Sequence, residues 1–167
     1  MSNHNHFSIR KAEKKDVATI MNLIRKLAEY EKLSHEVTAT DEMLEESLFG
    51  EKSVIAAIVG EENGIPVGFA LYFYNYSTFL GKKGLYLEDL FVLPEHRGKG
   101  YGKSLLAQLA KIAKEENCGR FEWSVLDWNE PAIKFYKSLG AVPMDEWTVY
   151  RMTEDKINIL SKEAITE

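Results

Sequence analysis

The segment that most constrains the fold lies at residues 84–126, where a strand, a helix and a second strand are expected in succession. Residues 84–93 predict a strand. Apolar residues then recur at helical spacing and predict a helix over 100–117, and a strand at 120–126 follows. Strands joined by a helical crossover are parallel neighbours, and ligands bind where such strands part. The pattern therefore predicts an α/β protein with a site at this point.

The rest of the chain adds further strands and helices to this centre. The additional strands are expected at 7–10, 53–59, 65–74 and 148–152, with a hairpin turn at Asn63-Gly64 and a loop at 75–83. The additional helices are expected at 13–29, at 40–50 with Thr40 as N-cap, between Asn129 and Gly140 with Asn129 as N-cap, and at 154–161. The fold class is a mixed α+β sandwich, with a mostly antiparallel sheet around a parallel strand–helix–strand core.

Size and charge limit the possible functions. The 167 residues suit a single domain over 1–167, with a disordered tail expected at 1–6. Lys and Arg total 21 against 26 Asp and Glu, and the net charge of −5 argues against nucleic-acid binding. The sequence has no signal peptide and no apolar run long enough to cross a bilayer, so we expect a cytoplasmic protein with no membrane partner. The single Cys118 allows no intramolecular disulfide, and the four histidines form no metal-binding pattern.

A glycine motif opens the expected helix at 100–117. Residues 97–102 have the form Arg-x-x-Gly-x-Gly, in which Gly100 and Gly102 allow a ligand to approach the backbone. Free N–H groups at a helix start favour anionic oxygen, so this segment suits a pyrophosphate. The alternative is a glycine-rich turn with solvated charges. The segment contains neither a Walker motif nor a dinucleotide fingerprint.

Two carboxylates, Glu88 and Asp89, precede this motif in the expected strand. Carboxylates beside a phosphate cradle suggest a second ligand with a cationic head. Neighbouring residues of an ideal strand point to opposite faces, so both carboxylates reach one site only if a bulge distorts the strand.

A second motif follows at residues 129–141. Tyr136 lies seven residues after Asn129, which places both on one side of the expected helix. Taken alone, this motif indicates a capping asparagine and a core aromatic residue. Taken together, the two motifs resemble the GNAT superfamily of acetyl-CoA-dependent N-acetyltransferases in their order and spacing. Within that superfamily, the segments Leu27–Glu31, Tyr86–Val92 and Trp128–Tyr136 resemble the diamine (spermidine/spermine) N-acetyltransferases.

The resemblance implies roles for individual residues. In the family, acetyl-CoA is the co-substrate, the strand pairs with its pantetheine arm and the glycine segment binds its pyrophosphate. The implied acetyl-CoA contacts are Leu90, Phe91, Val92, Arg97, Gly98, Lys99, Gly100, Tyr101, Gly102, Lys103, Asn129, Ala132 and Tyr136. Glu88 is the implied general base, acting through a water, and Tyr136 the general acid that protonates the thiolate. A backbone N–H of residues 90–92 would stabilise the oxyanion.

The resemblance also implies an amine site and a homodimer. The implied substrate residues are Tyr30, Glu31, Glu88, Asp89, Trp123, Asp145, Glu146 and Trp147. The chain departs from the family pattern in a shorter acidic stretch before Trp147 and in Phe79, where the family favours Trp. We expect the aromatic segment 72–79 to form a lid.

The sequence leaves several functions open. The main expectation is acetyl transfer to a diamine or polyamine. Lysine-like small amines such as thialysine are an alternative substrate class, and protein amines are a third. A function of another kind would be a non-catalytic acyl-CoA sensor, although the residues of both motifs are intact.

Overall fold

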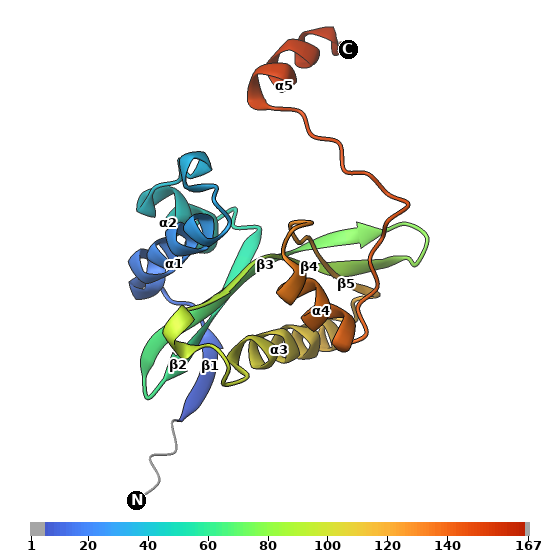
Figure 1. The fold of residues 1–167 in the computed structure, drawn as a ribbon. Coiled ribbons are helices and arrows are strands. Elements are labelled where there is room, and N and C mark those ends of the chain that lie inside the picture. The colour runs from blue at the N-terminus through green and yellow to red at the C-terminus, as the bar shows by residue number, and fades with distance from the viewer. Residues whose placement is uncertain (1–5, 166–167) are drawn as a thin grey trace, which may run out of the picture. The chain divides into compact units, whose positions relative to one another are not determined.

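The computed structural model describes residues 6–165. The chain divides after Leu126 into two compact units, whose helices and strands are labelled in Figure 1. The expectation of a single domain over 1–167 stays a prediction. The tail expected at 1–6 lies, apart from His6, outside the described residues. No helix in the described part of the chain has the length and apolar character needed to cross a membrane.

The first unit is built on a five-stranded sheet whose spatial order follows the sequence. The strands are β1 (Phe7–Lys11), β2 (Ile55–Glu62), β3 (Ile65–Ser77), β4 (Lys82–Val92) and β5 (Arg120–Trp123). Neighbouring strands are antiparallel except for β4 and β5, which are parallel. This confirms the expected mostly antiparallel sheet with one parallel strand–helix–strand unit.

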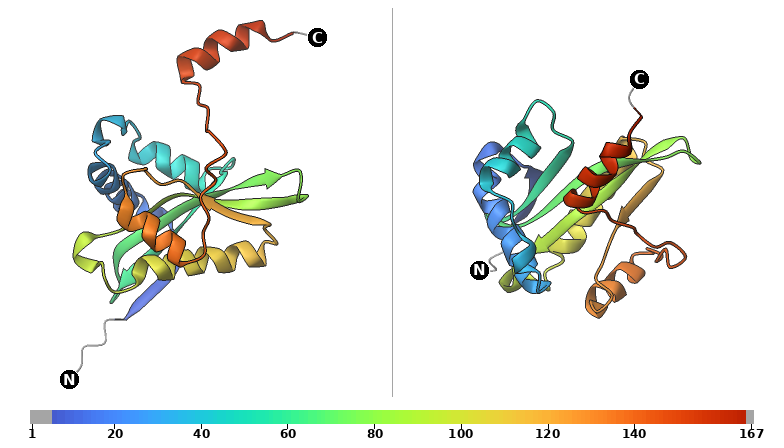
Figure 2. Two further views of the ribbon diagram at one scale, coloured as in Figure 1. Left: turned by 45° about the vertical axis from the view of Figure 1, so that its right-hand side comes forward. Right: turned by 90° about the horizontal axis from the view of Figure 1, so that it is seen from above.

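Helices cover both faces of this sheet, as the two views of Figure 2 show. The helices of the first unit are α1 (Val17–Tyr30), α2 (Asp41–Phe49) and α3 (Tyr101–Glu115), with short 3-10 turns η1 (Lys14–Asp16), η2 (Ser34–Glu36) and η3 (Pro94–His96). Helices α1 and α2 bury Ile20, Met21 and Leu44 against alternate residues of β2 to β4, among them Val59 and Phe91. Helix α3 lies on the other face.

Local signals set the boundaries of these elements. The Thr40 side chain accepts a hydrogen bond from the Met43 N–H at 3.2 Å, and α2 ends just before Gly50, as predicted. Asn63 and Gly64 have positive φ angles of 53° and 79°, which a two-residue hairpin turn of type I′ requires. This turn pairs Glu62 with Ile65 and joins β2 to β3.

The predictions of a loop at 75–83 and of a lid at 72–79 are both wrong. Strand β3 continues to Ser77 and β4 begins at Lys82, so only residues 78–81 connect them. Tyr76 pairs with Lys83, and the Lys83 ammonium lies 4.6 Å from the centre of the Tyr74 ring. Alternating aromatic residues favour a strand once a partner strand is present, and the long hairpin supplies that partner.

The second unit contains α4 (Glu130–Ser138), α5 (Glu154–Leu160) and the short turn η4 (Ser161–Glu163). Helix α4 lies where predicted and ends before Gly140, whose φ is 89°. Asn129 is at the predicted N-cap position of α4, but its side chain makes no capping hydrogen bond. The strand predicted at 148–152 is also wrong, because these residues pair with no strand among those described. β-branched and aromatic composition favours a strand only where a partner strand is available.

Candidate active site

A β-bulge in β4 shapes the centre of the site. Leu87 pairs with Tyr72 and Asp89 pairs with Leu71, so Glu88 is an extra residue with no partner in β3. Directly opposed residues share a face of the sheet, which puts Asp89 on the face of Leu71. This is the face covered by α1. The bulge that would let both carboxylates reach one site is therefore present.

Three carboxylates gather around this bulge. Asp89 is partly buried, and desolvation together with the charges of Glu88 and Glu31 raises its pKa to about 6. Glu31 directly follows α1, and its partial burial raises its own pKa. Glu88 is exposed to solvent. Burying negative charges together is unfavourable unless a cation joins them, so the cluster suits an ammonium group.

The edge of β4 opens at the same place. The parallel pairing of β4 with β5 ends at Leu87 and Trp123, while β4 continues to Val92. β5 stops at Trp123, so the strand predicted to reach Leu126 is shorter than expected. Beyond Leu87, alternate residues of β4 turn N–H and C=O groups toward an edge that β5 does not cover. An extended ligand with amide groups can pair there as a strand would.

The glycine segment joins this edge to α3. Gly98 and Gly100 have φ angles of 77° and 84°, which residues with a Cβ adopt only at a cost. A Cβ on either residue would meet no atom within 4 Å, so backbone conformation explains these two glycines. The first turn of α3 leaves its N–H groups without acceptors inside the helix. Free N–H groups and left-handed glycines are what the predicted pyrophosphate cradle needs, and its role stays a prediction.

The side chain of Arg97 holds this segment against the rest of the unit. Its Nε donates a hydrogen bond to the Val92 carbonyl at 2.9 Å. Its guanidinium lies 5.1 Å from the ring centres of both Tyr30 and Phe91. The structure therefore brings Tyr30 and Glu31, at the end of α1, to the same region as Arg97.

Two other residues of the segment contact a residue that the sequence analysis missed. Lys99 Nζ donates to Glu62 Oε1 at 2.7 Å, and the Tyr101 hydroxyl donates to the same oxygen. Glu62 ends β2 and is distant in sequence from both partners, so no spacing rule connects them. Only the packing of β2 beside the start of α3 reveals the contact.

The family match covers the elements just described. The family model described as "Acetyltransferase (GNAT) family" matches residues 18–141, which include the bulge, the open edge, the glycine segment and α4. The chain belongs to the GNAT acetyltransferase family.

Relatives of this GNAT protein extend over nearly the whole chain. A thialysine N-epsilon-acetyltransferase of Mus musculus is 37% identical over 164 residues, covering 92% of this chain and 96% of the relative. An L-ornithine N5-acetyltransferase of Arabidopsis thaliana is 33% identical over 205 residues, covering 95% of this chain and 90% of the relative. The solved structure of an integron cassette protein of V. cholerae superposes with a TM-score of 0.78 at 31% identity, covering 94% of this chain and 98% of that one. The superfamily resemblance is confirmed, and the narrower diamine subgroup remains a prediction.

GNAT acetyltransferases use acetyl-CoA, and the first unit of this one fits that co-substrate. The open edge at residues 90–92 offers backbone N–H and C=O groups. The Phe91 and Val92 side chains are buried, so only the backbone of these two residues can face a ligand. Gly98, Gly100 and the first turn of α3 offer N–H groups, and the exposed Lys103 adds positive charge. No group of three or more metal-ligating side chains occurs among the residues that the structure describes.

The remaining predicted site residues are Trp123, beside Leu87 at the point where β4 and β5 part, and a set in the second unit. Trp123 is at the end of β5 and packs edge-on against Phe121, with ring centres 4.9 Å apart. A further set belongs to the second unit, and its roles stay predictions from the resemblance: Asn129, Ala132, Tyr136, Asp145, Glu146 and Trp147. Within that unit, Tyr136 lies on α4 beside Phe135, with ring centres 5.7 Å apart.

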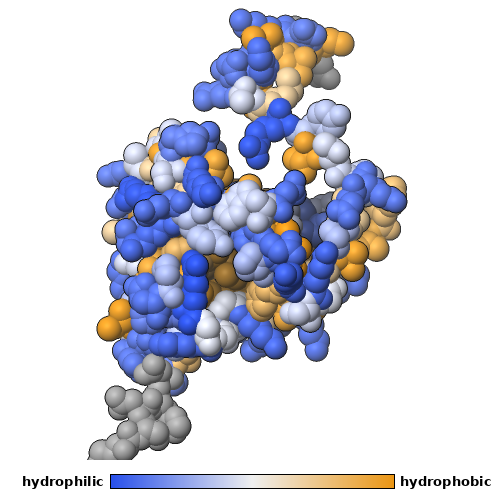
Figure 3. Space-filling model, in the orientation of Figure 1, coloured by the Kyte–Doolittle hydropathy of each residue, from blue (hydrophilic) through white to orange (hydrophobic). Residues whose placement is uncertain are grey.

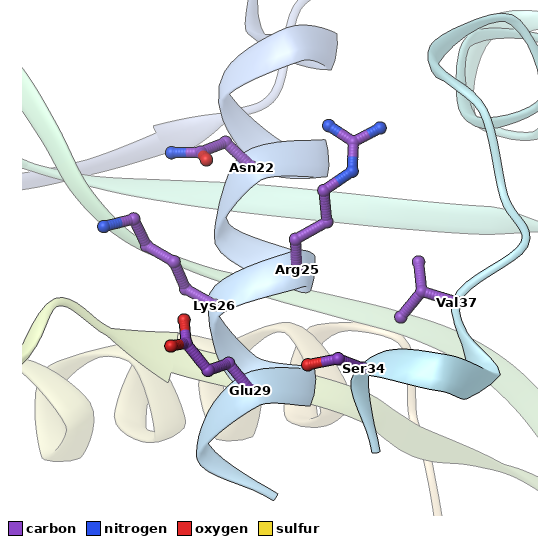
Figure 4. Close-up of a pocket in the computed structure, with 6 residues that line it drawn as sticks. All are labelled: Asn22, Arg25, Lys26, Glu29, Ser34 and Val37. Atoms are coloured by element: carbon purple, nitrogen blue, oxygen red, sulfur yellow. The ribbon is translucent and has the colours of Figure 1, made fainter. Parts of the chain in front are cut away.

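A groove on the outer side of α1 contains none of the predicted site residues (Figure 4). Its lining comes from α1 and the segment from η2 to Val37, and it comprises Asn22, Arg25, Lys26, Glu29, Ser34 and Val37. Arg25 also pairs with Asp41 at 3.5 Å. The lining is of mixed charge. Hydrophilic residues cover much of the face of the molecule shown in Figure 3.

Proposed function

We propose that this GNAT protein transfers the acetyl group of acetyl-CoA to the side-chain amine of a small lysine-like molecule, of the kind represented by thialysine and ornithine. The observation that carries the proposal is the cluster of Glu31, Glu88 and Asp89 beside the open edge of β4. The names of the thialysine and ornithine acetyltransferases that match more than nine-tenths of the chain support lysine-like amines over polyamines.

The carboxylates have two tasks in this reaction. An alkylammonium has a pKa near ~10, so it binds as a cation and must lose a proton before it attacks. Asp89 and Glu31 would attract the cation, because its arrival offsets the desolvation and the repulsion that together raise the Asp89 pKa. Glu88 is exposed at the bulge, where it can accept the proton through a water. We assign it the role of general base.

The backbone and a tyrosine would complete the transfer. Acetyl-CoA supplies an activated acetyl thioester. A backbone N–H at residues 90–92 would donate to the oxyanion that forms on the thioester carbonyl. The thiolate then needs a proton, and Tyr136 is the residue to which the family resemblance assigns that step. Attack of the amine on the thioester is direct, so the side chains need only bind and move protons.

A panel of amines tests this proposal. Purified protein is mixed with acetyl-CoA and, separately, thialysine, lysine, ornithine, putrescine, spermidine and spermine, and the release of CoA thiol is followed. We expect kcat/KM to be highest with the lysine-like amines. Preference for spermidine or spermine would contradict the substrate class and restore the diamine expectation.

Variants separate catalysis from binding. Glu88→Gln should lower kcat with thialysine by about 10²-fold, because general-base catalysis contributes that much. Glu45→Gln, on the exposed surface of α2, is the control and should leave kcat unchanged. Binding of CoA without turnover of any amine would favour the non-catalytic sensor.

A further inference from the structure

Glu62 is a buried carboxylate with no part in the transfer chemistry. It is the last residue of β2 and is 8% exposed. Most Glu side chains lie in water, and those that are buried need partners that neutralise and hydrogen-bond them. Three of its partners come from one short segment, residues 96–101.

Three side chains of that segment end at this carboxylate. Lys99 Nζ lies 2.7 Å from Oε1, the Tyr101 hydroxyl donates to the same oxygen, and His96 Nδ1 lies 2.8 Å from Oε2. The Lys99 and Tyr101 hydrogen bonds lower the pKa of Glu62 to about 2, so it is ionised at neutral pH. Charge-assisted hydrogen bonds of this kind are among the strongest in proteins.

The ring of Tyr101 adds a second attachment. It stacks on Phe7 of β1 with ring centres 3.9 Å apart and planes 5° from parallel. A Cβ on Gly60 would lie 2.7 Å from the Phe7 ring, so glycine at that position makes room for the stack. The start of α3 is therefore held by both β1 and β2.

The segment held in this way is the one whose backbone forms the cradle. Gly98 and Gly100 flank Lys99, and glycines lose more conformational freedom on ordering than other residues. A ligand that had to order this segment itself would bind more weakly. Pairing with Glu62 also holds the Lys99 ammonium against the protein, which leaves the Lys99 backbone as its contribution to the cradle.

We propose that Glu62 is a positioning residue of the acetyl-CoA site, which fixes the backbone of residues 96–101 in the conformation that binds the pyrophosphate. This rests on the proposed use of acetyl-CoA. It predicts that loss of the Glu62 charge weakens only ligands that carry the pyrophosphate.

A comparison of two acetyl donors, one with and one without the pyrophosphate, distinguishes a positioning role of Glu62 from a general loss of structure. For Glu62→Gln we expect the KM for acetyl-CoA and the Kd for CoA, measured by calorimetry, to rise about tenfold, the value of one charged hydrogen bond. With S-acetylpantetheine, which lacks the pyrophosphate, kcat/KM should match the parent, and kcat with acetyl-CoA should be unchanged. Equal losses with both donors, or an unchanged Kd for CoA, would overturn the proposal.

Matched variants complete the test. Glu61→Gln removes the neighbouring carboxylate, which binds Arg10 at 2.8 Å, and should leave the Kd for CoA unchanged.

Tyr101→Phe keeps the stack on Phe7 and removes only the hydroxyl. It should therefore raise the Kd for CoA by less than Glu62→Gln does, and it remains a usable test if Glu62→Gln unfolds. Lys99→Met should add little to Glu62→Gln in the double variant, since both remove one interaction. Full additivity would mean that Lys99 reaches the ligand itself and would overturn the proposal.

The calorimetry also separates this inference from the proposed function. A parent protein that binds CoA but acetylates no amine would contradict the proposed catalysis, while the Kd of Glu62→Gln would still decide the role of Glu62. A parent that does not bind CoA would contradict both.

Discussion

At the scale of single residues, Asp89 lies beside the bulge in β4, in surroundings that disfavour its ionised form. Its carboxylate is partly buried and lies near two others, Glu88 and Glu31. Stabilising interactions for its charge would have to come from a bound cation. Such residues are often conserved for function at a cost in stability, and the two effects can be measured separately.

Asp89→Asn should therefore stabilise the protein and weaken the enzyme. The folded-state pKa of about 6 lies above the ordinary value of 3.8, so ionisation of Asp89 costs stability as pH rises through 6. We expect the variant to be more stable than the parent at pH 8, by on the order of 2 kcal/mol, and nearly equal to it at pH 4. Urea unfolding at the two pH values measures this.

The activity of the same variant is the second measurement. In the parent, kcat/KM for the amine should fall as pH drops below about 6, where Asp89 gains a proton. In Asp89→Asn this dependence should be lost and kcat/KM should be low at every pH. A variant with parental activity at pH 8 would exclude Asp89 from the amine site.

At the scale of elements, the junction of β1 with α1 depends on one buried ion pair. Asp16 is 3% exposed and accepts hydrogen bonds from Arg10 at 2.7 and 2.9 Å and from the Glu13 N–H at 2.7 Å. Arg10 also binds Glu61 of β2. This network ties the first helix to two strands of the sheet.

Asp16→Asn should destabilise the fold by about 3 kcal/mol at pH 7, because it leaves Arg10 without its main partner. Arg10 holds the pKa of Asp16 below its ordinary value of 3.8. The contribution is thus present above pH ~3.8 and is lost as pH falls below it. The stability difference between variant and parent should therefore shrink at pH 2. A constant difference at both pH values would contradict the ion-pair origin.

The glycine segment yields a prediction about backbone conformation. Gly100→Ala must place a Cβ at a φ of 84°, which costs about 1–2 kcal/mol although nothing obstructs the Cβ itself. We expect a weaker Kd for CoA by about tenfold, measured by calorimetry. Ala110→Gly, at an exposed position in the middle of α3, controls for general loss of helix stability and should leave the Kd unchanged. An unchanged Kd in Gly100→Ala would mean that the cradle does not need this conformation.

Elements with local signals could be predicted from the sequence. The cap at Thr40, the turn at Asn63-Gly64 and the spacing of apolar residues in α3 each depend on near neighbours in the chain. Features that depend on tertiary pairing could not. The hairpin of β3 and β4 extends through residues first assigned to a loop, and Glu62 meets Lys99 across a gap of 37 residues. The sequence shows that Glu88 and Asp89 can share a site only if β4 contains a bulge, but it does not show whether the bulge forms, because that depends on pairing with β3.

At the scale of the whole molecule, the family resemblance predicts a homodimer. In the second unit, the segment between α4 and α5 pairs with none of the described strands, and Val149 and Tyr150 are largely exposed. Apolar residues of this kind favour burial against a second surface. Light scattering should give about twice the chain mass of 19.1 kDa. A monomer mass over the working concentration range would contradict the dimer.

The bulge in β4 has a consequence for how this site could have arisen. Leu87 and Asp89 already pair with successive residues of β3, so the sheet register is complete without Glu88. A chain lacking only that residue would keep Leu87 and Phe91 on the faces where each is now buried. The proposed base thus occupies the position of a one-residue insertion, acquired or lost without a second change in the core. We expect a chain that lacks Glu88 to fold with the same core and to lack the proposed base.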